Sequence, residues 1–379
     1  MKKLAFTVFF DTLILICIGL VIVLTASSTI SAIKFSDSLH LFNSHLIRVL
    51  IAFVVLIVFS FIPYEIYKSI SRSMLVVSVL VLVFTLFFAP EIKGAGRWLS
   101  IGGITFQPAD IAKLVLIIHL AAMIERKADY LDDFNNAFMP MFIWVMITSG
   151  LILIQPNISN GLLIITIALT IMFVGGVKFK QIFLSSLAMV LSGGAIAMIF
   201  SHSRQRILSF VNSIINGGDM NTQVRQALVS LGSGGLFGVG IGNSQQNNLF
   251  LPEAYGDFIF AILGEQLGFI GSVTVIFFYL VLFISGILIA KKAQDKFGQL
   301  LAFGITFSIA IYALVNIAVA TGTFPTTGLP LPFISYGGTS IIFLSMGVGI
   351  LINIAVLNSK KSKQTTVVLD ENNLAEQKV

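Results

Sequence analysis

Residues 257–290 read "DFIFAILGEQLGFIGSVTVIFFYLVLFISGILIA", an apolar run that holds only two ionisable side chains, Asp257 and Glu265. A helix crosses about 30 Å of membrane hydrocarbon with about 20 such residues. The whole chain is 56% hydrophobic and 11% charged, whereas a soluble domain carries about 25% charged residues. Because the apolar runs are long rather than short and alternating, we expect helices and not a β-barrel. The sequence therefore predicts an all-α, polytopic integral membrane protein.

Ten runs of this kind divide the chain. They lie near residues 8–31, 43–62, 73–89, 108–124, 138–154, 158–175, 180–201, 257–290, 298–321 and 333–356. The first is too long for a signal peptide and is interpreted as an uncleaved helix. A large loop, residues 202–256, separates the seventh run from the eighth. We expect residues 1–358 to form one ten-helix membrane domain, and the polar tail 359–379 to be disordered.

The distribution of Lys and Arg predicts which side of the membrane each loop faces. With the N-terminus inside, most basic residues fall in short inner loops, as Lys291 and Lys292 do, and cytoplasmic loops favour positive charge. We therefore expect both termini to be cytoplasmic. The long polar loops then all lie outside the membrane: 90–107, 202–256 and 322–332. No basic stripe with interleaved aromatic residues points to nucleic acid, so we expect no nucleic-acid partner.

Several polar residues lie at the outer start of the fourth run. Asp110 and Lys113 are three residues apart, so they share one face of the predicted helix. They form either a local ion pair that lets the helix begin or a part of a functional site. Arg97 and Trp98 precede them in "KGAGRWLSIGG". Because Trp is common at any membrane interface, Trp98 alone is weak evidence for a site.

The 202–256 loop is too long for a simple connector. Its stretch "NTQVRQALVSL", which contains Arg225, has apolar residues at helical spacing and is expected to lie flat on the membrane. The next stretch, "LGSGGLFGVGIGN", holds six glycines. A nucleotide-binding loop is excluded because no Gly-Lys-Ser/Thr follows and no strand precedes it. We expect a flexible, re-entrant or substrate-covering segment.

Asp257 stands where this polar loop meets the eighth apolar run. It is either the N-cap of a helix, a position that favours Asp, or a functional carboxylate at the membrane mouth. Glu265 lies two turns further in, about 12 Å deeper at about 1.5 Å per residue. With Glu253 and the basic residues above, these groups gather toward the outer side. A proton-relay transporter would spread them through the full depth, so the pattern favours chemistry or binding at the outer face.

Four stretches, in this order, resemble the SEDS family of bacterial membrane proteins, which includes FtsW, RodA and SpoVE. They are "GRWLSIGGITFQPADIAKL", "QVRQALVSLGSGGLFGVGIGNS", "LPEAYGDFIFAILGEQLGFIG" and "TGTFPTTGLPLPFISYGGTS". The ten-span plan agrees with that family, and the resemblance covers nearly the whole chain. It implies a peptidoglycan glycosyltransferase that polymerises lipid II on the outer face of the bacterial cytoplasmic membrane. The implied partners are lipid II, the undecaprenyl-linked glycan, a class B penicillin-binding protein and other membrane proteins of the division or elongation machinery.

The resemblance also implies roles for individual residues. The family's essential carboxylate corresponds to Asp257, the implied general base for the acceptor's GlcNAc 4-hydroxyl. Glu253 is a candidate for orienting the acceptor. The candidates for stabilising the departing pyrophosphate are Arg97, Lys113 and Arg225. The residues expected to be structural or supporting are Asp110, Glu265 and Trp98. No cofactor is evident, and although a divalent cation, Mg²⁺ or Mn²⁺, would suit the pyrophosphate, no metal-ligand spacing occurs.

The chain departs from the family's pattern at several positions. Asn157 stands where members commonly have Asp, Asp110 where they have Glu, and Gln266 where they have a second Glu. None of these positions is Asp257. The short spacer "QQNNLF" resembles the division type, which is FtsW-like, more than the elongation type, which is RodA-like. Two other functions stay open: a lipid II flippase, which needs a polar path to the inner leaflet, and a non-catalytic scaffold for a penicillin-binding protein.

Overall fold

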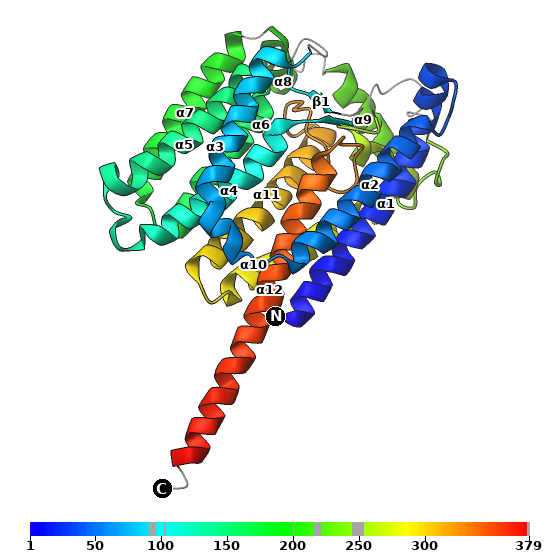
Figure 1. Cartoon of the computed structure of the whole chain (residues 1–379). Coiled ribbons are helices and arrows are strands. Elements are labelled where there is room, and N and C mark those ends of the chain that lie inside the picture. Colours follow the sequence, from blue (N-terminus) through cyan, green and yellow to red (C-terminus); the bar gives the residue numbers. More distant parts are fainter. Residues whose placement is uncertain (91–95, 102–103, 200, 216–220, 245–253, 377–379) are drawn as a thin grey trace.

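The computed structural model describes residues 1–90, 96–101, 104–199, 201–215, 221–244 and 254–376 (Figure 1). The long helices are α1 (Lys2–Phe35), α2 (His40–Phe61), α3 (Glu65–Phe88), α4 (Pro108–Arg126), α5 (Met139–Ile154), α6 (Ile158–Gly175), α7 (Phe179–Ile199), α10 (Ile259–Lys292), α11 (Lys296–Ala320) and α12 (Ser340–Glu376). The shorter elements are β1 (Leu99–Ile101), β2 (Ile104–Phe106), η1 (Ala128–Tyr130), η2 (Phe134–Phe138), α8 (Ser201–Ile215) and α9 (Thr222–Ser233).

Each of the ten predicted runs coincides with one long helix, which confirms the polytopic helical fold. Among the described residues, eight helices are long and apolar enough to cross a membrane. The two other long helices, α4 and α7, lie in the same bundle. α4 is not among the eight because it carries several charged side chains. α7 is not among them because its continuous apolar part, Phe179–Ala195, is too short. Composition therefore underestimates the tendency of α4 to lie within the membrane bundle, because the neighbouring helices surround its charged side chains.

The burial pattern follows the position of each helix in the bundle. α4 is central, and nearly every residue from Pro108 to Ile124 is buried. α2 lies at the outside and buries a single stripe: Leu41, His45, Val49, Ala52 and Leu56. That stripe has the three- and four-residue spacing of one helix face. α2 packs mainly on α12, α10 on α11, and α3 on α4.

The two ends of the bundle differ (Figure 1). One end carries the β1–β2 hairpin, in which Leu99 pairs with Phe106, together with α8 and α9. We call this the hairpin end. Both termini leave from the opposite end. There the Tyr64 hydroxyl donates a hydrogen bond to the Asp295 carboxylate and accepts one from Asn358 (3.3 Å). The Tyr64 N–H donates to the Asn353 side chain (3.0 Å). These bonds tie the α2–α3 and α10–α11 turns to α12 and fix the direction in which α12 leaves the bundle.

Three boundaries differ from the sequence-based expectations. α3 begins at Glu65 rather than near 73. α12 begins at Ser340 rather than near 333, because the preceding residues are irregular and include Phe333 and Gly338 with φ of 66° and 58°. α12 then continues to Glu376, although we expected disorder from 359. The tail has no Gly or Pro to end the helix. The division into domain and tail otherwise stays a prediction.

The glycine-rich segment packs its backbone on α10. α10 is broken at Gly268, where φ is 70° and ψ is −167°. At this break the Phe269 N–H donates to the Gly235 carbonyl (2.9 Å). A Cβ at Gly238 would lie 2.1 Å from the Gln266 carbonyl oxygen, so only glycine permits this approach. We expected this segment to be flexible, re-entrant or substrate-covering. In the structure its backbone is held against α10.

Candidate active site

Asp257 lies in the turn directly before α10, at the hairpin end of the bundle. The N-cap position of α10 is occupied by Phe258, so the start of the helix lies one residue after the N-cap that the sequence-based interpretation assigned to Asp257. The Asp257 side chain is half-buried.

The last interhelical loop, residues 321–339, holds the segment 255–257 in place through backbone carbonyls. The Ser335 hydroxyl donates to the Gly256 carbonyl (2.7 Å). The Tyr336 N–H donates to the Tyr255 carbonyl (2.9 Å). Asn316, near the end of α11, donates to the Asp257 carbonyl (2.8 Å). Three separate donors therefore fix the backbone that carries the Asp257 carboxylate.

Two arginines surround this carboxylate. Arg97, which precedes β1, and Arg206, from α8, both interact electrostatically with Asp257. Burial and the charge of Arg206 lower the pKa of Arg97, and the charge of Asp257 opposes that shift. Burial likewise lowers the pKa of Arg206, and Asp257 opposes it. The Arg97 Nε is buried without a hydrogen-bond partner. Two guanidinium groups near one carboxylate leave an excess of positive charge, which suits an anionic ligand.

Sequence reasoning missed Arg206. The structure brings it to the site because α8 crosses the hairpin end, where the Arg206 Nη1 donates to the Thr326 carbonyl (3.4 Å). A Cβ on Gly328 would lie 3.5 Å from the Asp257 Oδ2 and 3.8 Å from the Arg206 Nη1. Gly328 therefore lies against both groups. The signal in the sequence was a basic residue in the long loop, but nothing in its spacing distinguished Arg206 from Arg204 or Arg225.

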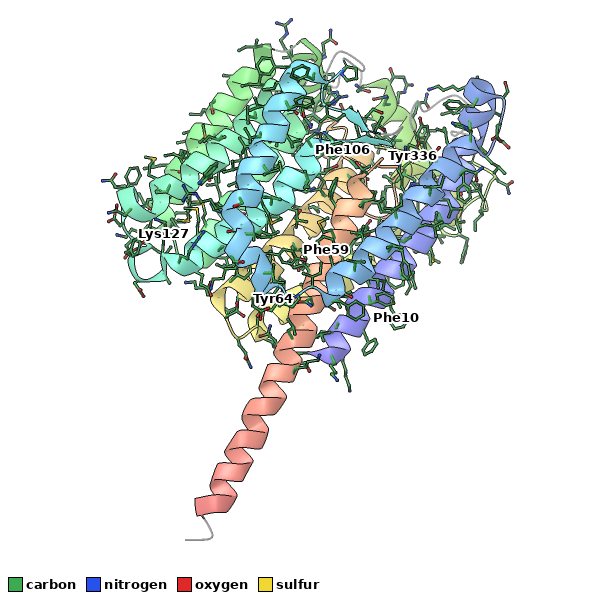
Figure 2. The ribbon with its side chains drawn as sticks, viewed as in Figure 1. Phe10, Phe59, Tyr64, Phe106, Lys127 and Tyr336 are labelled. Carbon is green, nitrogen blue, oxygen red and sulfur yellow. The ribbon has the colours of Figure 1, made fainter. Side chains whose placement is uncertain are left out.

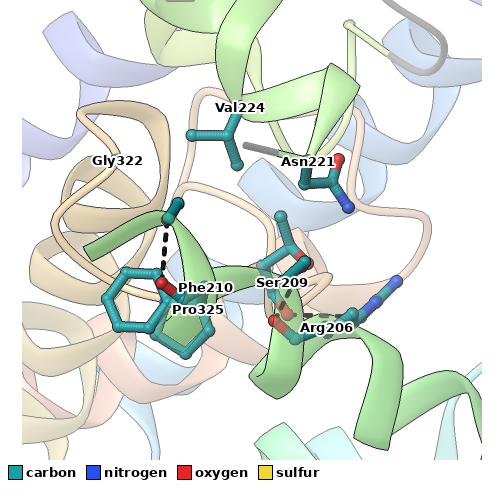
Figure 3. Close-up of a pocket in the computed structure, with 9 residues that line it drawn as sticks. Arg206, Ser209, Phe210, Asn221, Val224, Gly322 and Pro325 are labelled. Atoms are coloured by element: carbon teal, nitrogen blue, oxygen red, sulfur yellow. Dashed lines mark hydrogen bonds between the residues drawn. The ribbon is translucent and has the colours of Figure 1, made fainter. Parts of the chain in front are cut away.

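A small groove, with an accessible volume of about 20 Å³, adjoins Arg206 (Figure 3). Its lining comes from α8, α9 and the loop that follows α11: Arg206, Ser209, Phe210, Ser213, Asn221, Val224, Gly322, Pro325 and Thr326. The lining mixes a cation, hydroxyls and apolar side chains, which is the mixture that sugar and phosphate ligands require. Arg206, which interacts electrostatically with Asp257, is part of this lining.

Lys113 and Asp110 lie inside the bundle. Their side chains are buried and 3.7 Å apart, as the ion-pair interpretation of the sequence predicts. The Lys113 ammonium lies 3.9 Å from the centre of the Tyr312 ring. The Tyr312 hydroxyl donates to Asn160 (2.6 Å), and Asn160 donates to Asn157 (3.1 Å). Sequence reasoning placed Lys113 near the outer surface. In the structure the neighbouring helices enclose α4, so this row of polar side chains lies inside the bundle.

The remaining candidates are dispersed. Arg225 is exposed on α9, whose buried residues are Val224, Ala227 and Ser230. Glu253 lies outside the described residues. Trp98 is half-buried and packs against Gly338, where a Cβ would lie 3.3 Å from its ring. Glu265 is buried and accepts hydrogen bonds from Ser230 (2.9 Å) and Ser244 (2.5 Å). These bonds join α9 and the glycine-rich segment to α10, an arrangement that suits the supporting role expected of Glu265.

The site has few side chains that could ligate a divalent cation. No group of three His, Cys, Asp or Glu side chains that could hold a metal ion occurs among the residues that the structure describes. Mg²⁺ and Mn²⁺ prefer several oxygen ligands, whereas Asp257 is accompanied by two guanidinium groups. Because Mg²⁺ is often held by one or two carboxylates together with substrate phosphates, a divalent cation at the site stays a prediction, and no step is assigned to one.

Comparison with known proteins agrees with this description. The "Cell cycle protein" family model of FtsW, RodA and SpoVE matches residues 6–360. The chain is 36% identical to "Probable peptidoglycan glycosyltransferase FtsW" of Trichlorobacter lovleyi over 89% of each protein. It is 33% identical to "Stage V sporulation protein E" of Bacillus subtilis, over 91% of this chain and 94% of that protein.

Two solved structures share the fold at 22% identity. One, described as "Structural coordination of polymerization and crosslinking by a peptidoglycan synthase complex", has a TM-score of 0.73 and matches 93% of this chain and 97% of its own. The other, RodA of Thermus thermophilus, has a TM-score of 0.68 and matches 92% of this chain and 95% of its own. The extent of the family match and the identity to its members lead to one conclusion: the chain belongs to the FtsW, RodA and SpoVE family.

Proposed function

We propose that this chain is a peptidoglycan glycosyltransferase that polymerises lipid II, with Asp257 as general base. The observation that carries the proposal is the half-buried Asp257 in electrostatic contact with Arg97 and Arg206, with Gly328 next to both Asp257 and Arg206, at one end of a membrane bundle. The names of the relatives support the reaction class. A membrane-embedded enzyme suits a substrate that is itself anchored in the membrane by a lipid.

The chemistry follows from the positions of these groups. The acceptor's GlcNAc 4-oxygen attacks the anomeric carbon of the donor's MurNAc, and its proton passes to the Asp257 carboxylate. The new glycosidic bond forms as the bond to the diphosphate breaks, so undecaprenyl diphosphate leaves with the electron pair. Negative charge develops on that diphosphate. Arg97 and Arg206 stabilise it, because both are partly removed from water, where charge interactions are strong.

The setting of the reaction is also part of the proposal. The hairpin end faces the outside of the cytoplasmic membrane, and both termini are cytoplasmic. The relatives named FtsW favour a role in septal wall synthesis during division. The related complex that couples polymerisation to crosslinking supports a class B penicillin-binding protein as partner. The substrate is lipid II, and the product is an undecaprenyl-linked glycan.

A direct assay tests the reaction class. Purified full-length protein is reconstituted in lipid vesicles with its cognate class B penicillin-binding protein and given lipid II. We expect glycan strands, together with release of undecaprenyl diphosphate. A parallel assay follows movement of fluorescent lipid II between the leaflets. Translocation without polymer would support a flippase, and polymer formation that depends only on the partner's own active site would support a scaffold.

A further inference from the structure

Arg48 is a charged residue in a position where charge is costly. It is the only Lys, Arg, Asp or Glu in α2, which is one of the helices apolar enough to span a membrane. Arg48 lies eight residues below the start of that helix, about 12 Å at about 1.5 Å per residue. Ionisable residues at such positions are rare and generally serve a partner or a ligand. Sequence reasoning did not select it.

The partners of Arg48 do not neutralise its charge. Its Nη1 donates to the Tyr336 hydroxyl (2.8 Å), and its Cζ lies 5.2 Å from the centre of the same ring. Within the described part of the chain, no carboxylate lies within 4.0 Å of Arg48. A neutral phenol accepts one hydrogen bond but supplies no negative charge. The guanidinium is therefore not paired with a carboxylate of the described residues, and a guanidinium has five N–H donors, one of which binds Tyr336.

A second polar group next to it is also unsatisfied. His45, one turn earlier on α2, is fully buried, and neither of its ring nitrogens has a hydrogen-bond partner. Its ring lies 5.5 Å from that of Tyr336. Buried polar groups are normally paired, and an orphan calls for an explanation. Two polar side chains of α2 thus lie against one tyrosine, and no carboxylate of the described residues pairs with Arg48.

The direction of α2 points these groups toward the active site. Side chains of a helix lean toward its N-terminus, and α2 begins at the hairpin end, where Tyr336 lies (Figure 2). The Tyr336 ring packs edge-on against Tyr255 at 5.4 Å, two residues before Asp257. Arg48 thus approaches the site from the α2 side, with two tyrosines between it and the base.

We propose that Arg48 binds the diphosphate of the acceptor lipid II, at a subsite separate from Arg97 and Arg206. This inference rests on the proposed function. The reaction joins two lipid-linked diphosphates, and only the donor's diphosphate is next to the reacting atoms. The acceptor's 4-hydroxyl and its own diphosphate lie at opposite ends of a disaccharide. A cation set back from Asp257, on a membrane helix, matches the position of the acceptor's diphosphate beside its lipid anchor.

Two alternatives make different predictions. If Arg48 only positions the loop through its bond to Tyr336, then removing the Tyr336 hydroxyl has the same effect as removing the charge. If Arg48 binds phosphates of bulk anionic phospholipid, its effect follows the membrane composition. In the subsite account, the charge of Arg48 is essential and the hydroxyl of Tyr336 is secondary.

The experiment measures polymerisation rate against lipid II concentration in vesicles, using the full chain with its penicillin-binding protein. We expect Arg48→Gln to raise KM for lipid II tenfold or more with kcat within twofold, Arg48→Lys to recover part of the loss, and Tyr336→Phe to change KM less than threefold. Arg72→Gln, which removes an exposed charge from α3, is the matched control. Thermal unfolding of each variant shows whether it folds.

A binding arm separates this inference from the proposed function. Binding of farnesyl diphosphate, which has the diphosphate but no sugar, is measured with wild type and Arg48→Gln in vesicles with and without phosphatidylglycerol. We expect the variant to bind it at least fivefold more weakly at either lipid composition. If wild type makes no polymer, the proposed function fails while this arm still reports on the site. Equal farnesyl diphosphate binding, or equal effects of Arg48→Gln and Tyr336→Phe on kcat alone, overturns the subsite.

Discussion

The side-chain amide of Asn316 donates to the backbone carbonyl of Asp257 (2.8 Å) and to that of Leu329 (2.8 Å). One residue of α11 therefore joins the turn that carries the base to the loop that faces it. The bond to Leu329 is buried and the bond to Asp257 is partly buried, so replacing the donor leaves carbonyl groups without partners, at a cost of about 1–3 kcal/mol for a buried group.

We predict that Asn316→Leu lowers kcat for polymerisation at least tenfold with a smaller change in KM, because the position of Asp257 shifts while the outer groove remains. The measurement is a saturation curve in lipid II. Asn243→Leu removes a different amide, which is exposed and donates to the Val239 carbonyl (3.2 Å), and serves as control. An unchanged kcat for Asn316→Leu would show that the turn is held without this bond.

The break in α10 gives a prediction about stability. Gly268→Ala places a side chain at φ 70°, and its Cβ would lie 2.3 Å from the Gly238 nitrogen. A non-glycine residue in this region of φ and ψ costs about 1–3 kcal/mol, and overpacking typically adds about 1–3 kcal/mol. We therefore expect a clear fall in the thermal unfolding temperature in detergent. Gly232→Ala, where nothing lies within 4 Å, should be neutral or stabilising. Equal effects of the two variants would contradict the packing argument.

The buried pair in α4 allows a double-mutant test. Asp110→Asn leaves the Lys113 ammonium buried without its carboxylate, which typically costs about 3–5 kcal/mol. We expect Lys113→Met to be destabilising as well, and the combination Asp110→Leu with Lys113→Met to recover most of the stability. If Lys113 also contacts substrate, the double variant remains inactive although it folds. Recovery of full activity would assign the pair to structure alone. Stability is measured from unfolding curves, and activity is measured from polymer yield.

Arg206 supplies a prediction that the sequence did not offer. We expect Arg206→Gln to reduce kcat at least tenfold and Arg206→Lys to retain more activity, because a lysine keeps the charge but not the planar donor set. Arg204, exposed on the same helix, provides the control Arg204→Gln, which should be close to wild type. Similar losses in Arg204→Gln and Arg206→Gln would indicate a general effect of charge on α8.

The sequence predicted the fold well because apolar length is a local property. All ten long helices could be located from apolar runs in the sequence, although composition is weakest for α4, and the Asp110–Lys113 pair could be located from helical spacing. The sequence could not show that α4 is central, because enclosure depends on which helices pack around it. Nor could it select Arg206 or Arg48, whose partners Thr326 and Tyr336 lie more than 100 residues away in the chain. The glycines of 234–242 are explained only by contact with α10, a tertiary feature.

The central claim is that Asp257 accepts the proton, and single-turnover polymerisation tests it most directly. Wild type, Asp257→Asn and the control Asp37→Asn, an exposed carboxylate at the hairpin end, are compared at saturating lipid II with the penicillin-binding protein bound. We predict that Asp257→Asn binds lipid II and its partner as wild type does but forms the glycosidic bond at least 100-fold more slowly, since general-base catalysis contributes about 10²–10⁴-fold. Glycan synthesis at the wild-type rate by a folded Asp257→Asn protein would contradict the account.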